Sequence, residues 1–254
     1  MDRTTLIGIG ALVLIIGAGA LYVGLRPGPA KVPSGTLPAA LTGSYVEHAA
    51  YYDIETAYPT ETPLPGEASE AAITTMQGWV IETISQFKTD GNFDNLTPED
   101  IAMLGFDQGR KESLQITYKT VASPHTISYF FTTYSDTLGA HPNGFFKTFT
   151  FDTKTGAELS LTDLFAPGAK YLEQLSTIAR AKLPEVIGTQ YADADYIQSG
   201  TEPKDESFQN FVIDKGSLDI LFEPYQVGPY AIGPQTLPIP LADMKEVLKP
   251  EYRP

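Results

Sequence analysis

The loop from Gly139 to Gly144 (Gly-Ala-His-Pro-Asn-Gly) contains the polar side chains in this sequence best placed to contact a ligand. Its two glycines, proline and asparagine are typical of a turn of fixed shape. The imidazole of His141 and the amide of Asn143, with Asp136 and Asp152 as nearby carboxylates, could bind a metal ion or a ligand. No second histidine lies near this loop, which favours the alternative of a histidine hydrogen-bonded to the backbone.

A second loop, residues 223–234, holds Tyr225 and Tyr230 among three prolines and two glycines. Aromatic rings presented on rigid backbone can contact a sugar or a protein partner. They can also simply pack the loop onto a sheet. The sequence therefore predicts one ligand-binding surface made of His141, Asn143, Tyr225 and Tyr230, with both structural alternatives open.

No familiar catalytic motif accompanies these residues. The sequence lacks Gly-x-Ser-x-Gly, His-Glu-x-x-His, a P-loop and the dinucleotide-binding glycine motif. No two of its three histidines, His48, His125 and His141, are spaced as a His-x-x-x-His pair. Acidic neighbours such as Glu99 and Asp100 are typical of solvated charge, and nothing points to the carboxylate pair of a glycosidase. We therefore expect no catalytic residue, no metal and no cofactor.

Alternating apolar and polar residues predict the strands that position the two loops. Strands at 114–118 and 126–133 form a hairpin, and Phe145–Phe151 forms the next strand. The segment 152–156 predicts a tight turn with Gly156 at positive φ, and Ser160 or Thr162 caps the helical turn that follows. Further strands are predicted at 52–56, 208–213, 218–222 and 236–239, with helices at 67–88, 172–186 and 241–248 and an irregular segment at 188–205.

This pattern predicts an α+β fold, an antiparallel sheet with helices packed on one face. The first helix has an apolar stripe at steps of three and four residues, and Trp79 beside it is expected to face the core. Pro184 is expected to kink or restart the second helix.

The N-terminal region predicts a membrane anchor. Residues 6–25 form an uncharged apolar run of the length that crosses a bilayer as a helix, after a tail at residues 1–5. The alternative is a cleaved signal peptide with Ala18-Gly-Ala20 as its cleavage site. Four prolines make residues 26–43 a semi-extended linker.

The net charge and the absence of cysteine limit the classes of partner and site that the chain can have. The formal net charge of −14 argues against nucleic acid and other polyanions, and leaves basic proteins or neutral ligands open. There is no cysteine, which excludes disulfides and thiolate metal sites.

Several short segments carry a resemblance to a known family. They are Gly139-Ala-His-Pro142, Phe151-Asp-x-x-Thr-Gly156, Leu161-x-Asp-Leu-Phe165 and Pro224-Tyr-x-Val-x-Pro-Tyr-Ala-x-Gly233. Together they resemble the extracytoplasmic domain of unknown function shared by the anti-sigma factor RsiV and the peptidoglycan deacetylase PdaC. The resemblance divides the rest of the chain into an N-terminal PdaC-like subdomain, residues 44–112, and a C-terminal RsiV/PdaC-like subdomain, residues 113–254.

The resemblance implies a non-catalytic role. Deacetylases of the PdaC type use a pair of aspartates, and here Thr153 stands where the acid after Asp152 belongs. The tail at residues 1–5 is too short to be the cytoplasmic domain that an anti-sigma factor needs. We therefore predict a single-pass, membrane-anchored extracytoplasmic module that binds or senses a lysozyme-like basic protein (a muramidase) or peptidoglycan. The alternative is an unrecognised hydrolase of cell-wall glycan.

Overall fold

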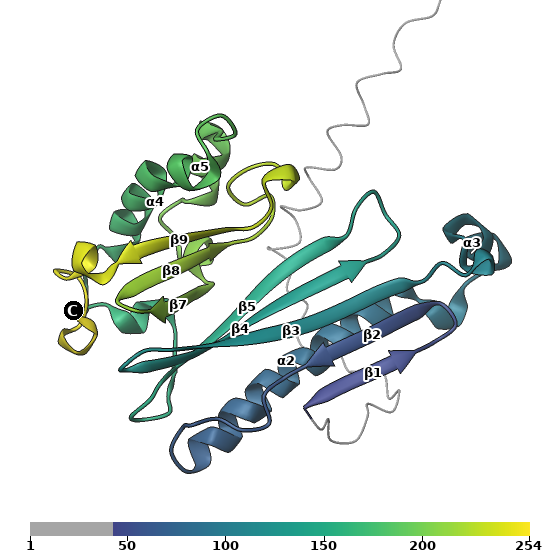
Figure 1. Cartoon of the computed structure of the whole chain (residues 1–254), viewed down its shortest axis with the longest axis horizontal. Helices are drawn as coiled ribbons and strands as arrows, with labels where there is room; N and C mark the ends of the chain where they lie inside the picture. The colour runs from purple at the N-terminus through teal and green to yellow at the C-terminus, as the bar shows by residue number, and fades with distance from the viewer. Residues whose placement is uncertain (1–42) are drawn as a thin grey trace, which may run out of the picture. The chain divides into compact units, whose positions relative to one another are not determined.

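The structure, a computed structural model, describes residues 43–254, which form two sheets with helices. The larger sheet has six strands in the order of the sequence (Figure 1). They are β1 (Ser44–His48), β2 (Tyr52–Ala57), β3 (Glu112–Ala122), β4 (Thr126–Asp136), β5 (Asn143–Asp152) and β6 (Glu158–Leu159). The three predicted strands that carry the first loop are confirmed as the long antiparallel β3–β4–β5.

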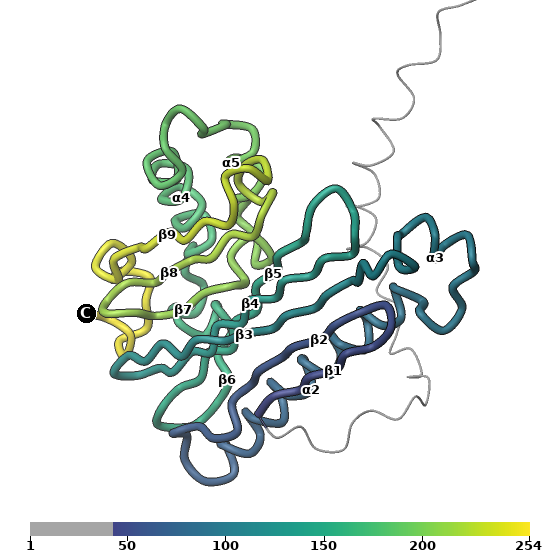
Figure 2. The backbone as a smooth tube through the Cα atoms, turned by 45° about the vertical axis from the view of Figure 1, so that its right-hand side comes forward, coloured from purple at the N-terminus to yellow at the C-terminus, as the bar shows by residue number. Residues whose placement is uncertain are grey.

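The expectation of a wholly antiparallel sheet is wrong at one place, because β2 and β3 pair in parallel. Between them lies α2 (Glu67–Gly91), followed by α3 (Pro98–Leu104). A chain that returns to the same end of a sheet through a helix places its next strand parallel to the last. The larger sheet is therefore mixed, and it curls beside α2 (Figure 2).

The first apolar core fills the space between α2 and the larger sheet. Met76, Val80, Ile84 and Phe87 form the buried stripe of the helix, as the sequence predicts. Alternate residues of the sheet meet this stripe. They include Ile54, Leu114, Ile116, Ile127, Tyr129, Phe131, Phe149 and Phe151.

A second sheet has its own core. It contains β7 (Phe211–Asp214), β8 (Ser217–Phe222) and β9 (Gln235–Pro240), and α4 (Tyr171–Ile187) packs on it beside α5 (Ala194–Gly200). Strand β7 contacts β3, β4 and β5, so the second sheet lies on the larger sheet (Figure 1). One sheet with helices on one face was therefore the wrong arrangement. Each of two sheets has its own helix, because each has its own apolar face to cover.

Several hydrogen bonds cross the seam between the two sheets. Asn210, only 5% exposed, accepts from the Thr148 amide at 3.3 Å. The Thr148 hydroxyl accepts from the Phe211 amide at 3.1 Å, and the Thr150 hydroxyl donates to the Phe211 carbonyl at 3.3 Å. Val212 and Leu221 are also buried but belong to neither core, so the layer between the two cores is partly polar and partly apolar.

The turn and the helix cap predicted from the sequence after β5 are both present in the structure. Gly156 has φ +74°, and the carboxylate of Asp152 accepts from the Thr155 amide at 2.7 Å to close the predicted turn. Ser160 and Asp163 form a capping box at the short helix Leu161–Leu164. The other 3-10 helices are Phe93–Asn95, Phe106–Gln108, Asp205–Phe208, Tyr230–Ile232, Leu241–Met244 and Pro250–Tyr252.

Two local predictions differ from the structure, and of the two outcomes expected at Pro184 the structure excludes a restart of the helix. Helix α5 lies in the segment 188–205 expected to be irregular, and the Asp193 carboxylate caps it. The predicted closing helix 241–248 is helical only over Leu241–Met244, as a 3-10 turn. Pro184 lies inside α4 without ending it.

The predicted tail, anchor and linker at residues 1–43 lie, except for Gly43, outside the described residues. Within residues 43–254, none of the helices is both long and apolar enough to cross a membrane.

Candidate functional site

The structure brings three of the four predicted site residues into direct contact. The Nε2 atom of His141 lies 2.8 Å from the Tyr225 hydroxyl, and the two residues are 84 positions apart. The His141 ring stacks on Tyr230 with 3.9 Å between ring centroids. The Tyr230 hydroxyl donates to the Pro142 carbonyl at 3.0 Å. We call His141, Tyr225 and Tyr230 the tip cluster.

The hydrogen bonds of the tip cluster define the role of each histidine nitrogen. Nδ1 of His141 lies 3.0 Å from the Pro142 carbonyl, which can only accept, so Nδ1 carries the proton. In the neutral ring Nε2 then accepts from Tyr225. Both nitrogens have partners, as expected for the backbone-bonded alternative. In the part of the chain that the structure describes, no group of three His, Asp or Glu side chains is arranged to hold a metal ion.

The two predicted acidic neighbours of His141 take other roles. The Asp136 carboxylate accepts from the Leu138 amide at 2.9 Å and holds the loop. Asp152 pairs with Thr126, at the opposite end of the β4–β5 hairpin from Asn143. The suggestion that Asp152 lies near His141 is therefore wrong, because the hairpin separates them by its full length.

Two of the four non-glycine residues with positive φ in residues 43–254 lie at this end of the molecule; the others are Asn92 and Lys215. Tyr225 has φ +69° and Leu138 has φ +58°, in a region that costs an L-residue with a Cβ about 1–2 kcal/mol. The Tyr225 side chain is nevertheless 50% exposed, so burial of its ring does not account for this conformation. Strained, exposed aromatic residues of this kind are more common at binding sites than in ordinary loops.

A cavity of about 410 Å³ adjoins the tip cluster between the β4–β5 hairpin and residues 224–234. Asn143 and Tyr230 line it, with Phe146 and Pro224. Behind it, Glu223 accepts from the Phe146 amide at 3.2 Å. Burial raises the pKa of the Glu223 carboxyl.

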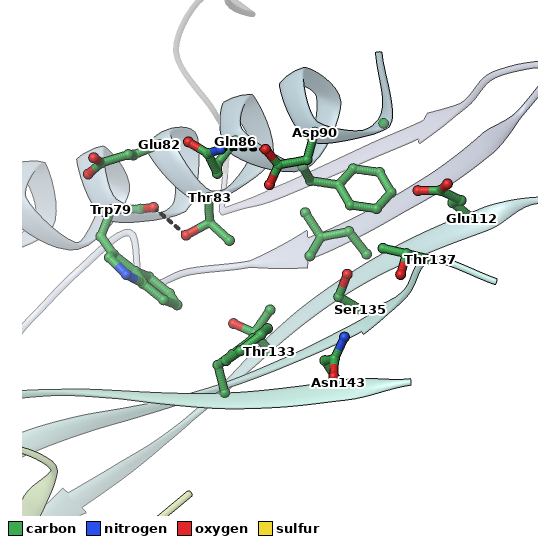
Figure 3. A pocket seen from close by; sticks show the side chains of 14 residues that line it. Trp79, Glu82, Thr83, Gln86, Asp90, Glu112, Thr133, Ser135, Thr137 and Asn143 are labelled. Carbon is green, nitrogen blue, oxygen red and sulfur yellow. Dashed lines mark hydrogen bonds between the residues drawn. The ribbon is translucent and has the colours of Figure 1, made fainter. Parts of the chain in front are cut away.

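A larger hollow of about 610 Å³ lies between α2 and the ends of β3, β4 and β5 (Figure 3). We call it the helix groove. Trp79 and Phe87 on α2 and Phe145 on β5 supply aromatic walls. Thr133 and Ser135, on the face of β4 that packs on α2, supply hydroxyls. The hollow exists because these short polar side chains replace the apolar residues that fill the same face further along β4.

Trp79 has two roles at this position. As predicted it packs on the core, with its ring centroid 5.2 Å from that of Phe131. It is only half-buried, and it also lines the helix groove.

All the charged residues that line the helix groove are acidic. Its charged lining residues are Glu82, Asp90 and Glu112, and no Lys, Arg or His of residues 43–254 is among them. Glu112 is 6% exposed and forms no ion pair within the described residues. Burial, and then the nearby Asp136, raise the pKa of its carboxyl.

Sequence reasoning found the tip cluster and missed the groove. The available signal was polar: Thr133 and Ser135 occupy the positions that the alternation of Ile127, Tyr129 and Phe131 assigns to the core.

Comparison with known proteins identifies the C-terminal region. Residues 162–242 match the family described as "Protein of unknown function (DUF3298)". The chain contains a DUF3298 domain. In the structure this matched segment spans α4, α5 and the β7–β9 sheet, and it includes Tyr225 and Tyr230. The predicted relation to a domain of unknown function shared with PdaC is confirmed.

Two curated proteins are similar to part of this chain. It is 33% identical over 144 residues to the peptidoglycan-N-acetylmuramic acid deacetylase PdaC of Bacillus subtilis, covering 56% of this chain and 31% of PdaC. It is 28% identical over 100 residues to the esterase Rv3036c of Mycobacterium tuberculosis, covering 39% of this chain and 42% of the esterase. The chain thus spans less than half of either relative.

Two crystal structures of DUF3298 proteins share the fold. One, BF2082 from Bacteroides fragilis, has a TM-score of 0.57 at 16% identity, covering 81% of this chain and 91% of that one. The other, PA4972 from Pseudomonas aeruginosa, has a TM-score of 0.52 at 16% identity, covering 86% and 97%.

Proposed function

We propose that this chain is a membrane-anchored, extracytoplasmic binding or sensing module of the bacterial cell envelope. The similarity to PdaC, a protein named as a peptidoglycan deacetylase, supports an envelope role. The apolar run at residues 6–25 supports an anchor.

The tip cluster is the observation that carries the binding role. Two loops distant in sequence meet there in a fixed geometry, with one strained and exposed tyrosine at their junction. A rigid surface loses little conformational entropy when it binds, so its contacts contribute more to affinity.

The charge of the molecule indicates a basic partner. Residues 1–42 contain one acidic and three basic side chains, so the described region carries −16 where the whole chain carries −14. A field of this sign speeds encounter with cations and repels anionic polymers. We therefore propose a cationic protein, with a muramidase as the first candidate, and peptidoglycan itself as the second ligand to test.

Calorimetry tests this with the full chain in a non-ionic detergent and a cationic lysozyme. We expect binding that weakens as salt rises, because exposed charges are screened over about 10 Å at 0.1 M. Tyr225→Ala combined with Tyr230→Ala should weaken it further. Tyr191→Ala, at a tyrosine that is 62% exposed outside the cluster, is the matched control. The absence of binding heat at low salt would contradict the proposed partner. Unchanged lysozyme affinity in the double variant would contradict the proposed binding surface.

Protease treatment of intact cells tests the location. Residues 44–254 should be digested while the membrane stays sealed. Full protection would reverse the topology, and a mature N-terminus at Leu21 would make the protein secreted.

The similarity to an esterase supports a second candidate, a hydrolase acting on cell-wall glycan or its ester and amide substituents. Release of acetate from N-acetylated peptidoglycan, or hydrolysis of a simple aryl acetate, would establish it. Such activity surviving Tyr225→Ala with Tyr230→Ala would place the chemistry away from the tip cluster.

A further inference from the structure

The helix groove has the composition of a site for a positively charged ligand, and it is separate from the tip cluster. Its lining combines three carboxylates with aromatic walls and hydroxyls, and its volume of about 610 Å³ is that of a small-ligand site. The other polar lining residues are neutral: Trp79, Thr83, Gln86, Thr133, Ser135, Thr137 and Asn143. A lining whose charged groups are all carboxylates complements a cationic ligand.

One buried hydroxyl in the groove has no partner. Thr133 is 2% exposed, and its Oγ1 atom makes no hydrogen bond within residues 43–254. Thr133 lies below Trp79 on the side of β4 that faces α2 (Figure 3). A buried polar group left without a partner costs stability, so its presence indicates that something else satisfies it.

On the opposite wall Glu112 has a carboxylate without an ion-pair partner among the described residues. A nearly buried carboxylate is normally paired with a cation, yet Glu112 has Asp136 as its charged neighbour and no cation. The basic side chains of neighbouring segments have other positions, and Lys111, next to Glu112 in the chain, pairs with Asp53 at 3.0 Å. Lys147 lies 5.0 Å over the Phe149 ring and is not part of the lining, and Lys88 pairs with Glu47.

We propose that the helix groove binds an organic cation, a primary ammonium group on an apolar stem such as a lysine-type side chain or a diamine. Ser113 pairs with Asp136, so Thr133 lies about four residues, or roughly 13 Å, along the sheet from Glu112. One ammonium therefore donates to the Glu112 carboxylate, and a polar group at the other end of the stem, such as the second ammonium of a diamine, reaches the Thr133 and Ser135 hydroxyls. The stem lies between Trp79 and Phe145, which is 48% exposed. An ammonium near these aromatic faces gains further from their π-electrons.

The sequence offers an internal reporter for this site. Trp79 is the only tryptophan of the chain, and it lines the groove. Its fluorescence in the full chain, held in a non-ionic detergent, therefore reports occupancy without any label. Cadaverine is the probe, pentanol its neutral analogue, and N-acetylglucosamine the test of a sugar site.

Two substitutions with matched controls separate binding from folding. Glu112→Gln should weaken cadaverine binding about tenfold or more, because it removes a charge-assisted bond. Glu158→Gln makes the same change at an exposed residue of β6 and should have no effect. Thr133→Val should weaken binding about fivefold without lowering the melting temperature, since it removes a hydroxyl that has no partner. Thr56→Val removes the other unpartnered buried hydroxyl, on β2, and should leave binding unchanged.

A saturable change of Trp79 emission with cadaverine, absent with pentanol and weakened in both groove variants, supports the proposal. It is overturned if cadaverine gives no saturable change, if pentanol acts equally, or if Glu112→Gln binds as the unchanged chain does. Tighter binding of N-acetylglucosamine than of cadaverine would assign the groove to sugars and overturn it as well. These outcomes are independent of lysozyme binding at the tip cluster.

Discussion

Gly156→Ala tests how the turn after β5 is fitted against α2. Gly156 has φ +74°, where an alanine is strained by about 1–2 kcal/mol. A Cβ added there would lie 2.2 Å from the Cβ of Ala68, in the first turn of α2. Carbon atoms normally approach to about 3.5–4 Å, so one backbone must move by more than 1 Å. Overpacking of this kind costs about 1–3 kcal/mol, which brings the total to about 2–5 kcal/mol.

Gly216→Ala is the matched control. Gly216 has φ +87° in the β7–β8 turn, and its added Cβ would meet nothing within 4 Å. Only the conformational cost of about 1–2 kcal/mol applies there. Urea unfolding of the full chain should therefore show Gly156→Ala to be the more destabilising substitution by about 1–3 kcal/mol.

Ala68→Gly provides the decisive comparison. It removes the clashing atom, and the nearest remaining atoms, Pro65 Cδ at 3.6 Å and Ala68 Cα at 3.7 Å, are at ordinary contact distance. In that background Gly156→Ala should cost no more than Gly216→Ala does. A double-mutant cycle measures the difference as a coupling free energy. Equal costs at Gly156 and Gly216, or no coupling with Ala68, would refute the close approach of this turn to α2.

Two further substitutions test buried polar groups, each by scanning calorimetry of the full chain. Glu112→Gln should raise the melting temperature at pH 7. Burial and the nearby Asp136 raise the pKa of Glu112 in the folded chain above its value in the unfolded chain. Ionisation of Glu112 therefore destabilises the folded chain as the pH rises past the unfolded pKa, and a glutamine avoids this cost. The gain should vanish below the ordinary glutamate pKa of about 4.3, and an equal gain at both pH values would contradict this cause. Asn210→Ala should cost about 2 kcal/mol, or about 4–8 °C, because it leaves the Thr148 amide unpaired in the seam. The exposed Asn95→Ala is its control, and a seam variant no less stable than that control would contradict the assignment.

The features that the sequence predicted correctly are those governed by local chemistry. The turn at Gly156, the cap at Ser160 and the apolar stripe of α2 each depend on residues within a few positions of one another. The β3–β4–β5 hairpins also follow from short connections between alternating strands. Such elements need no knowledge of distant partners.

The features that were missed depend on long-range pairing. Strand β2 alternates equally well whether its partner runs parallel or antiparallel, so the sequence could not indicate the crossover through α2. Helix α5 buries little more than Ile197, which leaves almost no periodic signal. The groove needs α2, β3, β4 and β5 together, whereas the tip cluster was predictable because both of its loops have distinctive compositions.

The seam between the two sheets has a consequence for how the molecule can move. Each sheet keeps its apolar core on the side away from the seam, so separating the sheets would leave both cores intact. Water can replace most of the hydrogen bonds that would be broken, whereas nothing replaces buried apolar contacts. The seam, which also covers the buried Val212 and Leu221, runs between Thr148 and Asn210, and the contact of His141 with Tyr225 lies at one end of it. A ligand that moved His141 away from Tyr225 would therefore act on the interface between the two sheets before it acted on either core.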